Sequence, residues 1–370
     1  MNRVVRLLVR LIFVFAIPIM VAYFTYLYLR SYFIEPVNPS NNQVVLVEIA
    51  PGMSFKQIAT ELALKNLVKA PWSIEILARI KQDDKKISAG EYELSQSMTP
   101  IRILEKLASG EVFQRKFTLK EGETISVIGE LVEKAGLVSA QELNKELEDP
   151  VLLTAAGIQA DSFEGYLFPD TYAFSRPITA RKIIWKMLNV GEKNWPAEYS
   201  NRAYQLGFTR HEIITLASII EKESGNTQEQ PQISSVFHNR LNQDMRLQAD
   251  PTVIYGIKNF DGNLTKAHLL TPTPYNTYTN KGLPPGPICN PGALAIKAAL
   301  YPAETNYLFF VADGSGGHVF SNTLSEHNNN VRKYQLNRKR NSDVKQETES
   351  LEEIEADVAA EPGTKEETQP

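Results

Sequence analysis

The chain contains a single cysteine, Cys289, so no disulfide bond within the chain can stabilise its fold. Its hydrophobic cores must supply the stability instead, and a chain of 370 residues is long enough to bury the apolar surface that this requires. No second cysteine and no histidine stands near Cys289 at the spacing of a metal site. We therefore predict that Cys289 is a buried, unreactive thiol.

The sequence also lacks the patterns that bind metals, phosphates or nucleic acids. The five histidines show no metal-ligand spacing, and no glycine-rich phosphate loop is present. Lysine and arginine rarely cluster, which argues against a nucleic-acid partner. Residues 341–370 carry ten acidic side chains and two lysines, so the first 340 residues have a net charge of +4 within a total of -4. We expect no cofactor and no metal, and a disordered acidic tail at 341–370.

One long apolar run is present, from Leu11 to Leu29. As a helix it would span about 28 Å, close to the hydrocarbon thickness of a bilayer, about 30 Å. We predict a transmembrane helix at residues 11–30. The alternative is a cleaved signal peptide, but the run is long for that role and no small-x-small cleavage motif follows it.

Arginines precede the apolar run at Arg3, Arg6 and Arg10, and only Arg30 follows closely. This asymmetry favours a cytoplasmic N-terminus at residues 1–10. The expected location is the inner (cytoplasmic) membrane, crossed once, with the body of the chain on the periplasmic or extracytoplasmic side. Residues 31–42 read as a polar, proline-containing linker out of the membrane.

Residues 43–119 read as a small α+β module. Strand patterns are expected at 43–49, 89–94 and 112–119, since they are rich in β-branched and aromatic residues. Ser54 begins one helix pattern, and Thr99–Pro100 opens another that Gly110 closes.

The start of this module recurs 70 residues later. Pro51–Val68 aligns with Glu121–Val138, so that a turn glycine, a hydroxyl N-cap and an amphipathic helix are used twice. The module resembles LysM glycan-binding domains, with part of the unit reused where the next domain begins. The alternative is a pair of generic strand–turn–helix units.

Residues 120–340 read as a larger mixed α+β domain. Helices are expected at Ala180–Leu188 and Arg210–Glu223, and a hairpin at Asn306–Asp313 and His318–Ser321 around Gly314–Gly317. The fold class is therefore α+β: an N-terminal transmembrane helix, a LysM-like module and a catalytic domain.

The helix expected at Arg210–Glu223 is the strongest candidate for chemistry. Thr209 and Glu212 have the spacing of a capping box, and the residues that follow are apolar on nearly all sides. Gly225 is expected to cap the C-terminus. Glu223 continues the buried stripe of this helix, whereas Glu221 points elsewhere and could form a salt bridge.

A carboxyl group in this position is expected to hold its proton. The negative end of the helix dipole and partial burial both disfavour the ionised form of Glu223, which raises its pKa. A protonated carboxyl near neutral pH is what cleavage of a glycosidic bond requires. The alternative is two solvated glutamates at a frayed helix end.

The 65 residues after this helix combine rigid prolines and glycines with tyrosine and amide side chains, which suit the faces and hydroxyls of sugar rings. Packing is the alternative role for any single tyrosine. The candidates for substrate binding are Ser224, Asn239, Arg240, Gln248, Asp250, Tyr255, Tyr275, Asn276 and Tyr278. Arg240 and Arg246 could instead be structural ion-pair partners.

At these residues the chain resembles the endolytic murein transglycosylases of the MltG (YceG-like) type, over about residues 45–335. The strings that carry the resemblance are EGYLFPDTY (Glu164–Tyr172), ASIIEKES (Ala217–Ser224), VFHNRL (Val236–Leu241), MRLQADPTVIYG (Met245–Gly256), TPYNTY (Thr273–Tyr278), GLPPGPICNPG (Gly282–Gly292) and FVADGSGGHVF (Phe310–Phe320). The resemblance implies that Glu223 is the catalytic acid and that Ser224 completes a Glu-Ser pair. His238 and the acidic tail depart from the family pattern.

The resemblance implies a lyase that cuts the MurNAc–GlcNAc β-1,4 bonds of peptidoglycan, leaves 1,6-anhydroMurNAc ends and terminates the elongation of nascent strands. Partnership with membrane-bound peptidoglycan synthases is also implied. A hydrolytic muramidase stays open, because Asp250 and Asp170 could be a second carboxylate. A non-catalytic, membrane-tethered glycan-binding scaffold also stays open. Some members of the family carry the label aminodeoxychorismate lyase, but a pyridoxal phosphate chemistry does not suit an extracytoplasmic body.

Overall fold

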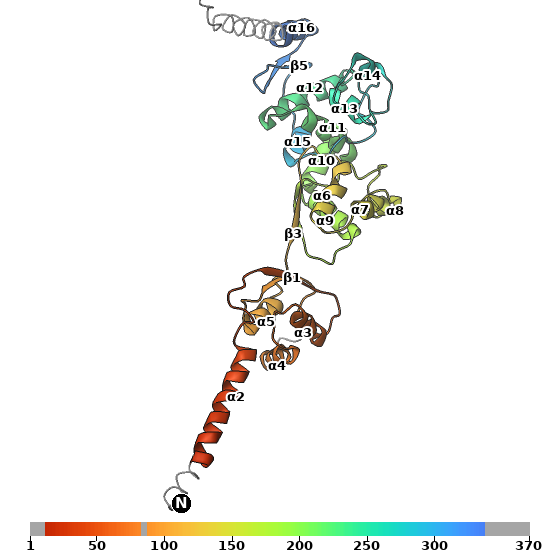
Figure 1. The fold of residues 1–370 in the computed structure, drawn as a ribbon. Coiled ribbons are helices and arrows are strands. Elements are labelled where there is room, and N and C mark those ends of the chain that lie inside the picture. Colours follow the sequence, from red (N-terminus) through yellow and green to blue (C-terminus); the bar gives the residue numbers. More distant parts are fainter. Residues whose placement is uncertain (1–11, 83–86, 337–370) are drawn as a thin grey trace, which may run out of the picture. The chain divides into compact units, whose positions relative to one another are not determined.

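The computed structural model describes residues 12–82 and 87–336. Within these ranges the strands form three separate two-stranded sheets among many helices, and the prediction of a mixed α+β fold is confirmed (Figure 1). The chain folds into two compact units that are not contiguous in sequence. Of the described residues, the first unit comprises 12–82, 87–117, 130–142 and 171–183, and the second comprises 118–129, 143–170 and 184–336. The acidic tail expected at 341–370 lies outside the described residues.

The N-terminal segment forms a helix whose described side chains are exposed, apart from half-buried Ser31–Phe33 at its end. A π-helical turn, η1 (Ile12–Ala16), leads into α2 (Ile17–Phe33), and no residue of α2 is buried. Pro18 lacks the N–H that would continue the hydrogen-bond ladder into η1. The 21 residues Phe13–Phe33 are long and apolar enough to cross a membrane, which fits either an anchor or a signal sequence.

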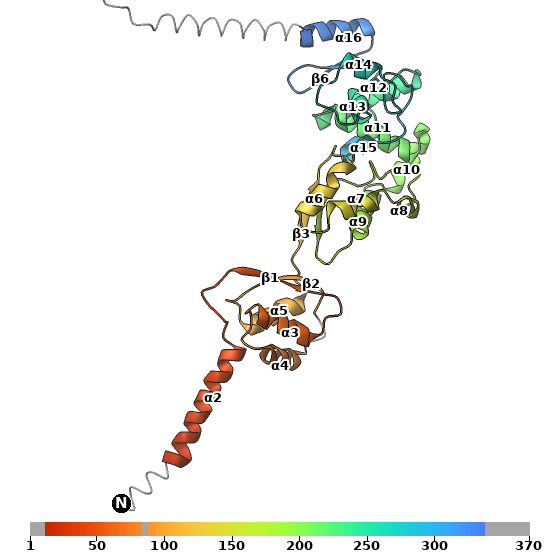
Figure 2. The same cartoon turned by 45° about the vertical axis from the view of Figure 1, so that its right-hand side comes forward.

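The next elements belong to the first unit, and all but α4 match the strands and helices expected from the sequence. They are β1 (Val44–Ile49), α3 (Phe55–Leu64), α4 (Pro71–Lys81), β2 (Gly90–Ser95) and α5 (Pro100–Ser109). Strands β1 and β2 pair antiparallel, from Val44 opposite Ser95 to Ile49 opposite Gly90. The three helices lie on one side of this sheet in both views (Figure 1, Figure 2). Their apolar stripes bury a core that includes Leu62, Ile74, Tyr92 and Leu104.

The internal repeat is visible in the backbone. Gly52 and Gly122 both adopt a positive φ, +80° and +77°, which places each in the conformation that only glycine adopts easily. Ser54 forms a full capping box at α3, but the Thr124 side chain bonds to Ser126 at 2.6 Å and does not cap the following helix. The turn geometry is therefore repeated and the cap is not.

The middle of the chain contributes segments to both units in turn. Its elements are β3 (Arg115–Leu119), η2 (Ile125–Val127), α6 (Ile128–Lys134), α7 (Ala140–Leu147), α8 (Pro150–Ala155), β4 (Asp170–Phe174) and α9 (Ala180–Lys193). Strands β3 and β4 pair, and Phe117 stacks on Tyr172 and Phe174 with ring centroids 5.5 and 6.0 Å apart.

The second unit is built around one buried helix, α11. Its elements from residue 197 onward are α10 (Ala197–Leu206), α11 (Arg210–Glu223), η3 (Thr227–Glu229), α12 (Gln230–Asn242), α13 (Asp250–Tyr255), α14 (Lys266–Leu270), α15 (Ala293–Leu300), β5 (Phe309–Ala312), β6 (His318–Ser321), α16 (Leu324–Val331) and η4 (Arg332–Leu336). Helix α11 packs against α12 and the alanine-rich α15, whose small side chains allow close approach. The expected hairpin is confirmed, since β5 and β6 pair antiparallel.

Replacing Gly165 by alanine is expected to destabilise the second unit strongly. Gly165 has φ +84°, and a Cβ atom there would meet Pro287 at 2.5 Å and Ile214 at 2.8 Å. Overpacking and the unfavourable φ together predict a loss of about 2–4 kcal/mol in the free energy of unfolding. Gly207→Ala is the matched control, because φ is +78° but no atom lies within 4 Å, so about 1 kcal/mol is expected. Urea unfolding followed by tryptophan fluorescence checks both, and equal losses would contradict the packing argument.

Candidate active site

Helix α11 runs through the core and places its last residue, Glu223, beside a cavity. Thr209 Oγ1 accepts a hydrogen bond from Glu212 N at 3.2 Å, and Glu212 Oε2 accepts one from Thr209 N at 2.7 Å, so the predicted capping box is present. All eight residues from Ile213 to Ile220 are buried. This packing fixes the helix over its length, and its last residue, Glu223, is held at a defined position.

The prediction that Gly225 caps α11 is wrong. Ser224 leaves the helix in an extended conformation, and its Oγ donates to Asn226 O at 2.5 Å and accepts from Asn226 N at 3.2 Å. A hydroxyl side chain that bonds to the following turn ends the helix one residue earlier, without a left-handed residue. Ser224 thus holds the turn that follows Glu223.

Glu221 faces away from Glu223, as predicted, but its partner is a backbone amide. Its Oε2 accepts a hydrogen bond from Gly292 N at 3.0 Å, where α15 begins. A carboxylate at a helix N-terminus interacts favourably with the helix dipole. Burial raises the pKa of Glu221, and this hydrogen bond opposes the increase.

A cavity of about 480 Å³ lies in front of Glu223. Its polar lining is Glu223, Arg240, Gln248, Asp250, Tyr278, His318, His327 and Gln335. Strand β5 and helix α16 supply an apolar wall that includes Phe309, Phe310 and Leu324. The side chains come from segments more than 100 residues apart, and the fold of the second unit brings them together.

The carboxyl group of Glu223 has little contact with solvent. It reaches the cavity surface, yet protein atoms surround most of it, and no group in the described ranges donates a hydrogen bond to it. Burial raises the pKa of Glu223 to about 8, the negative charge of Asp250 adds to the increase, and the positive charge of Arg240 opposes it. Glu223 therefore carries a proton at neutral pH and can give it up in the cavity.

Arg240 is a fixed cation in the cavity wall. Its Nε donates to Leu308 O and its Nη1 to Leu247 O, both at 2.7 Å, and the guanidinium lies over the Phe309 ring at 5.1 Å. Burial lowers the pKa of Arg240, but a guanidinium remains charged at neutral pH. Carbonyl oxygens carry no full charge and do not neutralise Arg240. Its positive charge therefore acts on Glu223.

Asp250 is held by a tyrosine. Tyr278 Oη donates a hydrogen bond to Asp250 Oδ1 at 2.6 Å, and burial together with this carboxylate raises the pKa of Tyr278 well above its usual value. Asp250 is the first residue of α13 and Tyr278 lies in the loop after α14. The pair fixes a negative charge close enough to Glu223 to raise its pKa.

The other residues predicted to bind substrate lie outside the cavity lining. Asn239 Nδ2 donates to Thr305 O at 2.9 Å and to Tyr307 O at 3.0 Å, next to the start of β5. Tyr255 and Tyr275 pack against each other with ring centroids 4.8 Å apart. Two residues considered for other roles also lie outside the lining. The Arg246 carbonyl accepts a hydrogen bond from Arg240 Nη1 at 3.3 Å, and Asp170, the possible second carboxylate, lies exposed at the start of β4.

Asn276 is fully buried and fastens the loop that carries Tyr278. Its Nδ2 donates to three carbonyls, of His268, Leu269 and Thr271, and its Oδ1 accepts from Tyr278 N at 2.8 Å. This arrangement positions Tyr278 without exposing Asn276 to the cavity.

Replacing Asn276 by alanine is expected to lower the free energy of unfolding by about 2–4 kcal/mol, because several part-buried backbone groups would lose their hydrogen-bond partner at once. Activity should fall as well, since Tyr278 would lose its support. Exposed Asn263 is the matched control, and its alanine variant should be nearly unchanged. Chemical denaturation and activity assays check both variants, and a stable, fully active Asn276→Ala variant would contradict the assignment.

Several cavity residues were missed by the sequence analysis. Phe309, Phe310, His318 and His327 line it, with His318 Nδ1 2.9 Å from Glu229 Oε2 and His327 stacked on Phe309 at 5.2 Å. The hairpin around Gly314–Gly317 could have indicated them, since the sequence places Phe309 and Phe310 before this turn and His318 directly after it.

A second buried carboxyl, Glu164, was also missed. It accepts hydrogen bonds from Ile125 N at 3.1 Å, Asn290 Nδ2 at 3.2 Å and Tyr255 Oη at 3.3 Å. Burial raises the pKa of Glu164 to about 7, and the hydrogen bonds from Ile125 and Tyr255 oppose this increase. Glu164 is not part of the cavity lining and ties three segments of the second unit together.

Cys289 is buried, as predicted, with Sγ 3.4 Å from Ser218 O, and burial raises the pKa of its thiol. Across residues 12–82 and 87–336, no three His, Cys, Asp or Glu side chains are grouped so that they could hold a metal ion.

A protonated carboxyl beside a fixed cation, in a cavity lined by polar and aromatic side chains, is the kind of arrangement that enzymes using general acid catalysis require. The YceG-like family model matches residues 47–333, and the chain belongs to this family. The resemblance found in the sequence is thereby confirmed.

Similar proteins agree with this assignment. The chain is 32% identical over 324 residues to the endolytic murein transglycosylase of Bacillus subtilis, covering 84% of this chain and 89% of that protein. It is 30% identical over 341 residues to that of Streptococcus pneumoniae, covering 84% and 61%. A crystal structure of a YceG-like protein from Listeria monocytogenes has 34% identity and a TM-score of 0.54, covering 78% of this chain and 99% of that one.

Proposed function

We propose that this chain is a membrane-anchored endolytic transglycosylase of peptidoglycan. It cuts the β-1,4 bond between MurNAc and GlcNAc, leaves a 1,6-anhydroMurNAc end and so terminates elongation of nascent glycan strands. The observation that carries the proposal is Glu223, a carboxyl with a pKa raised to about 8 and a free face on a cavity. The names of the similar proteins from B. subtilis and S. pneumoniae support the choice of substrate.

In this proposal Glu223 acts twice. Its proton passes to the glycosidic oxygen as the bond from that oxygen to C1 of MurNAc breaks, and the GlcNAc hydroxyl leaves. The Glu223 carboxylate then takes the proton of the MurNAc C6 hydroxyl, whose oxygen attacks C1 and closes the anhydro ring. Atoms balance without water, and Glu223 ends protonated as it began.

The neighbours of Glu223 suit both steps. Arg240 stabilises the carboxylate that forms after proton donation, and Asp250 favours return of the proton. Asp250 is also the second carboxylate that a hydrolytic muramidase would need, but its Oδ1 accepts the hydroxyl of Tyr278 at 2.6 Å. We infer that Asp250 stabilises positive charge that develops at C1 and that it does not activate water.

The cavity divides the predicted binding residues into two groups. Arg240, Gln248, Asp250 and Tyr278 are proposed to contact the sugar, together with Phe309, Phe310 and His318, whose rings offer apolar faces to it. Ser224, Asn239, Tyr255, Tyr275 and Asn276 are proposed to hold the surrounding loops.

The apolar helix at Phe13–Phe33 is proposed to anchor the chain in the inner membrane once, with a cytoplasmic N-terminus and the rest of the chain on the periplasmic or extracytoplasmic side. The α+β module at residues 43–119 is proposed to be LysM-like. Membrane-bound peptidoglycan synthases are proposed partners, because the synthases and this chain would both act on glycan strands that are still near the bilayer.

Product analysis tests the proposed function. Purified glycan strands are digested with the full chain in water labelled with heavy oxygen, and the new ends are identified by mass spectrometry. Anhydro ends without label are expected, whereas labelled reducing ends would indicate a hydrolase. Intact strands, under conditions where the chain still binds them, would favour the non-catalytic scaffold.

A further inference from the structure

Helix α4 in the first unit carries apolar side chains on two sides. Ile74 and Ala78 are buried in the core of the unit, whereas Trp72, Ile76 and Ile80 are 39%, 41% and 74% exposed. Because an α-helix has 3.6 residues per turn, three positions four residues apart fall within an arc of about 80°. A surface helix of a water-soluble domain places polar residues on that side, so this apolar face requires an explanation.

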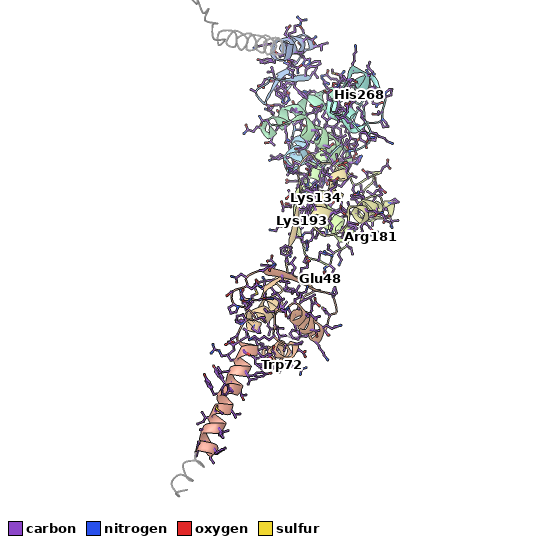
Figure 3. The ribbon with its side chains drawn as sticks, viewed as in Figure 1. Glu48, Trp72, Lys134, Arg181, Lys193 and His268 are labelled. Carbon is purple, nitrogen blue, oxygen red and sulfur yellow. The ribbon has the colours of Figure 1, made fainter. Side chains whose placement is uncertain are left out.

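The same face begins at the end of the membrane helix. The Trp72 ring centroid lies 5.0 Å from that of Tyr32 and 5.5 Å from that of Phe33, and the Tyr32 and Tyr28 centroids are 4.9 Å apart. Trp72 is labelled in Figure 3. Aromatic side chains thus continue from α2 onto α4. Tryptophan and tyrosine are enriched where a membrane meets water, because one part of each ring is apolar and another is polar.

One basic side chain of α4, Arg79, borders this face, and other basic residues lie near the ends of the helix. Arg79 and Lys81 lie in the last turn of α4, and exposed Lys69 precedes its first residue. Lys81 also pairs with Glu105 at 2.9 Å, and Glu75 is the one acidic residue of the helix. An amphipathic helix with Trp and Ile on one side and basic residues beside them is typical of a helix that lies in a membrane interface.

We propose that α4 is a second membrane contact and lies in the plane of the bilayer, with Trp72, Ile76 and Ile80 at the boundary between headgroups and acyl chains. This inference rests on the proposed role of α2 as an anchor. Scattered exposed apolar residues are ordinary on a protein surface. These three are contiguous on one helix face and continue from α2, which favours lipid over a second copy of the chain as the occupant.

Fluorescence of the full chain in vesicles of phosphatidylcholine and phosphatidylglycerol tests this proposal. Lipids brominated close to the headgroup quench tryptophans at the interface. The chain has three tryptophans, Trp72, Trp185 and Trp195, and the last two belong to the second unit. The quenched emission should therefore disappear in the Trp72→Phe variant.

A double variant, Ile76→Glu with Ile80→Glu, should also lose the quenching of Trp72. Val151→Glu, at a position 68% exposed on α8, is the matched control and should keep it. Circular dichroism verifies that each variant is folded, since exposed positions tolerate substitution. If the chain floats with the vesicles but Trp72 is not quenched, the α4 contact is overturned and the anchor stands. If it does not float, the anchor and the α4 contact both fail.

Discussion

Replacing Glu223 by glutamine is expected to lower transglycosylase activity about a thousandfold while leaving the fold and glycan binding intact. Glutamine has almost the same shape as glutamate but has no proton to give to the glycosidic oxygen, and positioned acids contribute about this factor. The measurement is the rate of release of anhydro ends from glycan strands. Retention of more than about a tenth of the activity would contradict the assignment of Glu223 as the acid.

Glu221→Gln is the matched control for this variant. Glu221 lies two residues earlier on the same helix and accepts a hydrogen bond from Gly292 N, which a glutamine oxygen can also accept. Activity should therefore stay close to that of the unmodified chain. A large loss in Glu221→Gln would indicate that disturbance of α11, and not proton transfer, explains the effect at Glu223.

Thermal stability distinguishes loss of chemistry from loss of fold. The pKa of Glu223 rises from its ordinary value of 4.5 to about 8 on folding, so between these values the folded chain holds a proton that the unfolded chain has released. Stability of the unmodified chain should fall as the pH rises through this range. Glutamine does not titrate, so Tm of Glu223→Gln should equal or exceed that of the unmodified chain at pH 8.

The second expected result concerns the pH dependence of activity. The acid must be protonated in the free enzyme, so kcat/KM should be level below about pH 8 and then fall about tenfold per pH unit. Asp250→Asn removes a negative charge that raises the pKa of Glu223, and the fall should begin at lower pH. Activity should be weaker at every pH, because the negative charge proposed to stabilise C1 is lost, and the loss should be largest near pH 8.

Asp244→Asn is the control for the pH profile. Asp244 is likewise an exposed aspartate of the second unit, but it pairs with Lys281 and does not line the cavity. Its profile should match that of the unmodified chain. A shift of the Asp250→Asn profile to higher pH would contradict the electrostatic account of the site.

The sequence predicted the elements that depend on local patterns. Ser54, Thr99 and Thr209 are N-caps in the structure, and the bounds of α11 agree with the expected helix at both ends. Glu223 could be singled out because a buried helical stripe led to it. The predicted cap at Gly225 was wrong because Ser224, whose side chain bonds to the following turn, ends the helix. From the sequence alone, the neighbouring glycine is the more usual helix terminator.

The rest of the site depends on contacts between distant segments. Asn239 and Asn276 look like sugar ligands in the sequence, but their side chains satisfy backbone carbonyls. A polar residue in a loop can bind a ligand or its own backbone, and the two choices have the same sequence pattern. The face of β5 that meets the cavity and the division of the chain into non-contiguous units likewise arise only on folding.

The most direct test of the account is a titration of Glu223 itself. Carbon NMR of glutamate-labelled protein follows each side-chain carboxyl with pH, and the signal absent from the Glu223→Gln spectrum identifies Glu223. Glu164 and Glu221 also have raised pKa values, so this assignment by difference is essential. A midpoint near 8 is expected, and a midpoint near 4.5 would mean that no proton is held in the cavity at neutral pH.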